Sequence, residues 1–253
     1  MTTEWDFLLL ALAALVAGMV NAIAGGGTLI TFPTLAALGV PPVAASVTNA
    51  IALCPGYLGG VLAQLKDLRG QLRLVSLLAP AAIVGGIAGG ALLLNTEEKL
   101  FRSMVPFLIL GASLLTAMQD PLRAWLTKRG AGAKSALLTG IGVALVAIAA
   151  IYGGYFNAGL SVIVMGVLGA VFDGTFHRLN AVKAVIALVT NFSATVFFLF
   201  SSEVLWLTVL VMAAAALVGG ALGGRLASRV KPSTLRWCVV AIGTSIGIVY
   251  LVR

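Results

Sequence analysis

The sequence predicts an all-α membrane protein of about ten hydrophobic helices, some broken or short, in two inverted repeats of five. Three observations support this prediction: an extreme apolar composition, long hydrophobic runs separated by short basic loops, and an internal duplication. Of the 253 residues, 60% are hydrophobic and only 9% are charged. About a quarter of the residues in a soluble domain are charged, so a soluble fold of this length would lack the charges to cover its surface.

The hydrophobic runs predict repeated crossings of the bilayer. A helix needs roughly 20 apolar residues to cross about 30 Å of hydrocarbon. Two runs, 28–40 and 157–171, are shorter, and each follows a glycine-containing break, at 25–27 in one case and at 153–154 in the other. The ten predicted segments are 5–23, 28–40, 43–63, 72–94, 100–118, 135–152, 157–171, 178–201, 204–226 and 235–252.

An internal duplication divides the chain into two halves. Residues 79–92 read APAAIVGGIAGGAL and residues 213–226 read AAAALVGGALGGRL, an offset of 134 (213 − 79). A GGxxGG pattern alone indicates only that two helices pack closely, but the similar flanking residues favour duplication. We therefore expect a first transmembrane repeat over 1–118, a basic linker over 119–134 and a second transmembrane repeat over 135–253.

Loop charges predict how the two repeats are oriented. If all ten segments cross, the basic clusters fall on one side, which the positive-inside rule assigns to the cytoplasm together with the linker. The acidic loop at Glu97 and Glu98 corresponds to a basic loop at 229–231. Five segments per repeat is an odd number, so the second repeat is inverted, and inverted repeats are typical of alternating-access transporters. The four basic clusters lie around 66–73, 123–134, 178–183 and 229–236.

The broken helices indicate where a substrate should bind. In inverted-repeat carriers, helices interrupted at matching positions of the two halves form the substrate site. This rule selects the stretch from Gly25 to Thr28 and the stretch from Gly153 to Asn157. A helix that restarts after a break presents free N–H groups and a partial positive charge, which suits an anion. The alternative is a packing kink that binds nothing.

Polar residues in the segments that follow the breaks extend this site. A lysine inside a span costs roughly 2.5–3.5 kcal/mol unless it is paired or hydrated. Lys183 therefore either faces the cavity or extends its amine to the cytoplasmic interface. Asn191 lies deeper in the same segment and needs a hydrogen-bonding partner or a wet cavity. The predicted substrate-binding residues are Gly25, Gly26, Gly27, Thr28, Thr48, Asn49, Asn157, Lys183 and Asn191.

Three motifs of the first half carry a family resemblance: NAIAGGGTLI from Asn21, LGVPP over 38–42 and VTN over 47–49. They resemble the TauE/SafE sulfite-exporter family, also called the toluene sulfonate uptake permease family, and the resemblance covers nearly the whole chain. It implies a membrane carrier associated with sulfite, sulfonates and other organic anions.

The resemblance also nominates site residues, namely the glycine break, Thr48, Asn49 and Lys183. The family commonly has lysine directly after its Thr-Asn pair, where this chain has Ala50. The near-equivalent position of the second half, 183, does hold lysine. The site would therefore lack one positive charge of the family's pattern, which puts the usual substrate in doubt.

The predicted function is secondary transport, in the export direction, of a small anion such as sulfite, a sulfonate or another organic anion, by alternating access. The alternatives are an anion channel and an intramembrane enzyme, but the chain has one histidine and no HExxH motif. No catalytic residue, metal site or cofactor is expected. The expected partners are a small anion, the lipid bilayer and further copies of the chain in a homo-oligomer. Nucleic acid is not expected, because the basic residues fall mainly in short clusters between the apolar runs, where the positive-inside bias places them. The expected location is the bacterial inner membrane.

Overall fold

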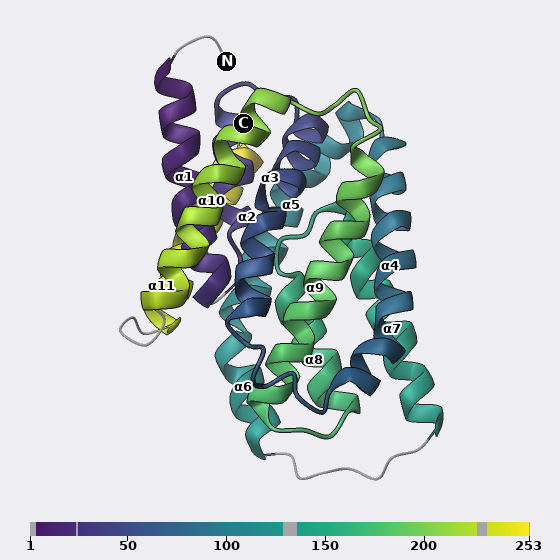
Figure 1. The fold of residues 1–253 in the computed structure, drawn as a ribbon. Coiled ribbons are helices and arrows are strands. Elements are labelled where there is room, and N and C mark those ends of the chain that lie inside the picture. Colours follow the sequence, from purple (N-terminus) through teal and green to yellow (C-terminus); the bar gives the residue numbers. More distant parts are fainter. Residues whose placement is uncertain (1–3, 24, 129–135, 227–231, 253) are drawn as a thin grey trace.

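The computed structural model describes residues 4–23, 25–128, 136–226 and 232–252, and all regular structure in them is helical (Figure 1). This confirms the predicted all-α class. The helices are α1 (Glu4–Ile23), α2 (Thr28–Ala37), α3 (Pro42–Leu62), α4 (Leu72–Leu94), α5 (Glu98–Ala117), α6 (Gln119–Lys128), α7 (Ala136–Tyr155), α8 (Leu160–Val171), α9 (Phe176–Phe198), α10 (Trp206–Leu226) and α11 (Pro232–Val252).

Eight of the described helices are long and apolar enough to cross a membrane, and two apolar helices are too short to cross alone. The short ones are α2, with 10 residues, and α8, with 12. At 1.5 Å per residue each spans roughly 15–18 Å, about half the hydrocarbon thickness. These are the two short segments that the sequence predicts, although α2 ends at Ala37 rather than at residue 40.

The prediction of about ten helices omitted α6, which lies in the predicted linker. Its sequence, QDPLRAWLTK, is too polar to count as a span, and proline at its third position suits a first helical turn. Asp120 of α6 forms a salt bridge with the buried Arg236 of α11. The 129–134 part of the predicted linker lies outside the described residues.

The two most buried spans, α3 and α9, form the centre of the bundle. Their apolar windows are 67% and 56% buried, against 28–39% for the other six spans. Near one end Asn180 of α9 donates a hydrogen bond to Gln64, just beyond α3, and nearer the other end Thr195 of α9 donates to the Ala50 carbonyl of α3. The two helices therefore run antiparallel.

Glycines let two outer helix pairs pack at backbone contact. A Cβ added to Gly89 of α4 would lie 2.0 Å from the Ile151 carbonyl oxygen of α7, and one added to Gly219 of α10 would lie 2.0 Å from the Leu15 carbonyl oxygen of α1. Both glycines belong to the two GGxxGG patterns. The first pattern therefore packs α4 against α7, and the second packs α10 against α1. Both α1 and α7 are helices that precede a break.

Replacing Gly89 with alanine is expected to lower the thermal stability of the purified protein by several degrees, because the new methyl overpacks a backbone contact and costs about 1–3 kcal/mol. Gly111 of α5 is the matched control, because an added Cβ there has no neighbour within 4 Å. Gly111→Ala should be neutral or slightly stabilising. Thermal unfolding in detergent measures both, and equal behaviour of the two variants would contradict the packing role.

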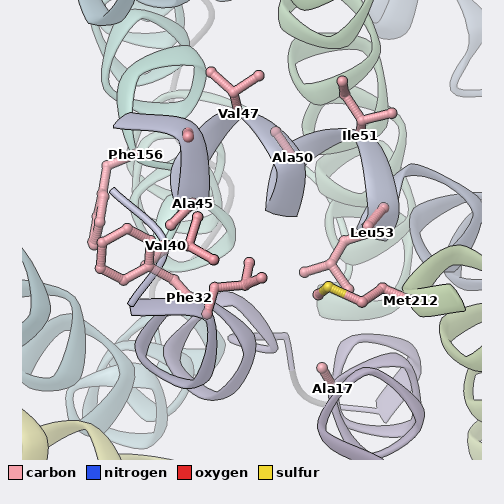
Figure 2. Close-up of a cluster of buried hydrophobic side chains, with 14 of the residues drawn as sticks. Ala17, Phe32, Val40, Ala45, Val47, Ala50, Ile51, Leu53, Phe156 and Met212 are labelled. Atoms are coloured by element: carbon pink, nitrogen blue, oxygen red, sulfur yellow. The ribbon is translucent and has the colours of Figure 1, made fainter. Parts of the chain in front are cut away.

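A buried aromatic cluster closes the space between the broken helices and the end of the molecule that carries the α4–α5 loop. The rings of Phe32 and Phe156 meet edge to face with centroids 5.2 Å apart, and Phe101 packs edge-on against Phe156 and Tyr155. The Tyr155 hydroxyl lies 3.4 Å from the Thr96 Oγ1 in that loop. Figure 2 shows Phe32 and Phe156 beside the residues of α3 that complete this core.

The described helix ends that adjoin the basic loops meet at the opposite end. The Gln64–Asn180 hydrogen bond joins the end of α3 to the start of α9, and the Asp120–Arg236 salt bridge joins α6 to the start of α11. Figure 1 shows α6 and the start of α9 at the lower end of the bundle and both chain termini at the upper end. One end of the bundle is therefore basic, and the aromatic cluster separates the broken helices from the other end.

Candidate functional site

The first helix break lies where the sequence predicts it, between α1 and α2. Gly25 and Gly26 have φ angles of +81° and +98°, a conformation that side-chain-bearing residues rarely adopt. The Gly27 amide donates a 2.8 Å hydrogen bond to the Asn21 Oδ1, which ties the break to the last turn of α1. The following helix starts at Thr28 without a side-chain cap. The Leu29 and Ile30 amides donate to the Gly26 and Gly27 carbonyls, which leaves the Thr28 amide without a partner among the described residues and available to a ligand.

The second break is displaced from its predicted position. Gly153 and Gly154 are helical and belong to α7, and the break spans 156–159 instead. A Cβ on Gly154 would lie 2.2 Å from the Gly86 carbonyl oxygen of α4, so this glycine serves helix packing. Asn157 has φ +69° and Gly159 has φ +80°, and asparagine is one of the few other residues that tolerate this region.

The two breaks enclose a small cavity, which we call the inner chamber. It measures about 10 Å³, and the uncapped starts of α2 and α8 both border it. None of its described lining residues is charged. The amides of Gly159 and Ser161 have no hydrogen-bond partner among the described residues. The lining comprises Gly25, Gly26, Thr28, Tyr57, Thr116, Asn157, Gly159, Ser161 and Val162.

Asn49 of α3 supports the first break from behind the chamber. Its Oδ1 accepts a hydrogen bond from the Thr31 hydroxyl, and its Nδ2 donates to the Thr28 Oγ1 over 3.4 Å. All three side chains are buried. Asn49 therefore fixes the first polar residue of α2 without lining the chamber itself.

Asn191 of α9 does the same for the second break. Its Oδ1 accepts a 2.5 Å hydrogen bond from the Asn157 Nδ2, and its own Nδ2 donates to the Ala50 carbonyl over 3.0 Å. The Tyr57 hydroxyl completes the chain by donating to the Asn157 Oδ1 over 3.2 Å. The carboxamide of Asn157 is therefore held between α3 and α9.

A second cavity, which we call the vestibule, leads from the chamber toward the basic end. It measures about 40 Å³. The Lys183 amine donates a 2.8 Å hydrogen bond to the Asn180 Oδ1, and the buried Asn21 Nδ2 has no partner among the described residues. No acidic residue occurs in its described lining, so the cavity is electropositive. The lining comprises Asn21, Ala22, Gly25, Tyr57, Gly60, Gln64, Ser161, Asn180, Lys183, Ala184 and Ala187.

Most predicted site residues lie at or directly behind these two cavities. Gly27 packs against the Asn21 side chain, and a Cβ there would lie 2.6 Å from the Ala17 carbonyl oxygen. Thr48 is the exception, because its hydroxyl accepts a 3.2 Å hydrogen bond from the Leu205 amide and lines neither cavity. Its observed partner is the start of α10, which makes Thr48 a structural residue in this state.

Four residues that line the cavities were not predicted as site residues: Asn21, Tyr57, Thr116 and Ser161. Asn21 and Tyr57 had a signal in the sequence, because each is a polar side chain inside an apolar, glycine-containing run. Thr116 and Ser161 had none, since single hydroxyl residues are common in membrane helices, where they bond to a preceding carbonyl. Thr116 makes such a bond, to the Ala112 carbonyl over 2.7 Å.

These features define the class of the protein. Eight helices long enough to cross a membrane, together with two half-length helices that begin at buried cavities, are typical of an integral membrane transporter. The chain belongs to the family described as "Sulfite exporter TauE/SafE", which matches residues 10–250. The resemblance noted in the sequence is thereby confirmed.

Similar bacterial proteins are described as transporters. The chain is 28% identical over 225 residues to the "Probable membrane transporter protein" of Haemophilus influenzae, covering 89% of this chain and 86% of that one. It is 27% identical over 223 residues to the Escherichia coli K12 "Probable membrane transporter protein YfcA", covering 85% and 77%. It is 27% identical over 243 residues to the "Probable membrane transporter protein ORF9" of a Sinorhizobium species, covering 93% and 88%. The family and these names identify a membrane transporter.

Proposed function

We propose that the protein is a secondary carrier of a small anion, such as sulfite or a small sulfonate. One observation carries this proposal: two helices start, uncapped, at the same buried cavity, whose described lining has no acidic residue. Two helix N-termini place unpaired N–H groups and partial positive charge at one point, which favours an anion. The Lys183 amine in the vestibule adds a full positive charge on the approach.

The helix pattern supports two repeats of inverted topology. The helices α9, α10 and α11 begin 134 residues after α3, α4 and α5, since 176 − 42, 206 − 72 and 232 − 98 all equal 134. Packing is exchanged between the halves as well: α1 packs on α10, and its counterpart α7 packs on α4. This reciprocal packing, in which each repeat contributes one helix to each pair, is expected if a two-fold axis in the membrane plane relates the two repeats. The antiparallel arrangement of α3 and its counterpart α9 is expected for the same reason.

Alternating access fits the asymmetry of the observed state. The vestibule extends from the broken helices to Gln64 at the basic end, whereas the aromatic cluster around Phe32 and Phe156 fills the corresponding space toward the other end. By the positive-inside rule the basic end is cytoplasmic, which assigns α6 and the linker to that side. The observed state then faces inward, in the inner membrane of a bacterium.

Export is the direction that this charge distribution favours. No acidic residue occurs in the described lining of either cavity, so this lining offers no carboxylate to relay protons. A carrier of an anion needs no such relay for export, because an inside-negative potential favours exit by roughly 2.3 kcal/mol per charge per 100 mV. Entry through the positive vestibule on the cytoplasmic side is consistent with that direction.

Counterflow in proteoliposomes tests the carrier against an anion channel. Vesicles preloaded with unlabelled sulfite should take up labelled sulfite faster than empty vesicles. Internal sulfite binds the carrier and speeds the return of its binding site to the outer face, where labelled sulfite binds. A channel shows no such acceleration. Thermal unfolding of the purified protein with sulfite, thiosulfate, small sulfonates and small carboxylates identifies the anion that stabilises it. If none of these anions stabilises the protein and none is transported, the proposed function is wrong.

A further inference from the structure

Tyr57 of α3 lies where the inner chamber meets the vestibule. Both cavities are lined by Gly25, Tyr57 and Ser161, and only the tyrosine has a large side chain. Among the described residues it is also the one partly buried side chain that packs against both apolar core clusters. Its hydroxyl donates to the Asn157 Oδ1. The tyrosine side chain therefore separates the two cavities.

The size of the chamber requires this side chain to move before a substrate can enter. A cavity of about 10 Å³ holds about one water molecule. A sulfur oxyanion carries several oxygens around a larger central atom and does not fit. The additional space that the anion needs lies toward the vestibule, and the ring of Tyr57 occupies it. The hydroxyl is held by hydrogen bonding between neutral groups, chiefly to the Asn157 Oδ1, so rotation of the side chain breaks no ion pair.

We propose that Tyr57 is the residue that admits anions from the vestibule to the inner chamber and sets the largest size that passes. This inference rests on the proposed function. Rotation of the side chain joins the two cavities, and the anion moves from the Lys183 amine to the uncapped starts of α2 and α8. Compact oxyanions pass the displaced ring, whereas sulfonates with a bulky organic group are excluded by it.

Efflux of sulfite and benzenesulfonate from proteoliposomes tests the size limit. Tyr57→Ala is expected to raise the ratio of benzenesulfonate to sulfite flux about tenfold, since removing a ring from a selective passage admits larger substrates. Tyr250→Ala is the matched control, because the same truncation there alters a separate groove between α1, α2 and α11. The control should keep the wild-type ratio.

Tyr57→Phe provides a second test that keeps the ring and hence the packing. It removes the hydrogen bond to Asn157, so the maximal sulfite flux should rise while the half-saturation concentration stays unchanged. A raised half-saturation concentration at unchanged maximal flux would make the hydroxyl a substrate ligand and overturn the inference. If Tyr57→Ala does not reach the membrane, the kinetics of Tyr57→Phe alone test the role of Tyr57.

The outcomes separate the two proposals. Wild-type transport of sulfite with an unchanged flux ratio in Tyr57→Ala overturns the role of Tyr57 and leaves the carrier function intact. Unchanged kinetics in Tyr57→Phe would count against the role in the same way. Wild-type vesicles that move neither probe, nor any of the other small anions, overturn the carrier function and the size limit together.

Discussion

Replacing Gly26 with valine is expected to reduce anion flux by about tenfold or more, because a β-branched residue at positive φ costs about 1–3 kcal/mol and forces the break to rearrange. Gly26 has φ +98° and lines the inner chamber. Any relaxation of its backbone moves the start of α2, and with it the amides that we propose to bind the anion. Flux into proteoliposomes, divided by the amount of reconstituted protein, measures the effect.

Gly39 provides a control with the same backbone strain at a remote place. It has φ +81°, is exposed in the turn between α2 and α3, and an added Cβ has no neighbour within 4 Å. Gly39→Val should therefore show a similar loss of stability with near-normal flux. If both variants transport equally well, the first break is a packing feature and does not form the substrate site.

The spans were predictable because the bilayer imposes a simple rule on the sequence. The predicted segment 72–94 coincides with α4, and the predicted segment 5–23 differs from α1 by one residue. Each is an apolar run bounded by polar or glycine-containing turns, and a helix satisfies all the backbone hydrogen bonds of such a run within lipid. The short helix α2 was recognisable for the same reason, because the glycines before it interrupt an otherwise continuous run.

Glycine alone did not identify the second break, because glycine serves two purposes in membrane helices. At Gly154 the absence of a side chain lets α7 contact α4, whereas at Gly159 it permits a positive φ angle. A single sequence does not distinguish a glycine that permits helix packing from one that permits a positive φ angle. The helix that packs on Gly154, α4, is remote along the chain. The helix α6 escaped prediction because a polar helix on a bundle end needs neither length nor an apolar run.

Some site residues were recognisable in the sequence, and others were identified only in the structure. The broken backbone and Lys183 stand out in the sequence, since glycine runs and a charge inside an apolar segment both need an explanation. Tyr57 is a polar side chain in an apolar run, but its position in the sequence does not reveal its role, because that role depends on how α3 is rotated against α8 and α9. Only the three-dimensional arrangement places its hydroxyl 3.2 Å from the Asn157 Oδ1, at the boundary of two cavities.

Replacing Lys183 with glutamine is expected to raise the half-saturation concentration for the anion about tenfold, which corresponds to about 1.4 kcal/mol of binding energy. The amine lines the vestibule beside the unpartnered Asn21 Nδ2, and the described lining has no acid to neutralise it. The effect should shrink at high ionic strength, because salt screens the attraction between the lysine and the approaching anion. Concentration dependence of uptake at two salt levels measures it.

Two features of the position make this change a test of charge rather than of structure. Glutamine retains an N–H donor for the Asn180 Oδ1, so the hydrogen bond that Lys183 makes at 2.8 Å can be replaced. Lys66→Gln removes one positive charge from the basic end without touching either cavity, because Lys66 is exposed beyond α3. Equal half-saturation concentrations in the two variants would mean that Lys183 attracts the anion only as one of the positive charges of the basic end, without direct contact. A shift confined to Lys183→Gln requires the anion to pass close to this amine, and therefore to use the vestibule as its route to the broken helices.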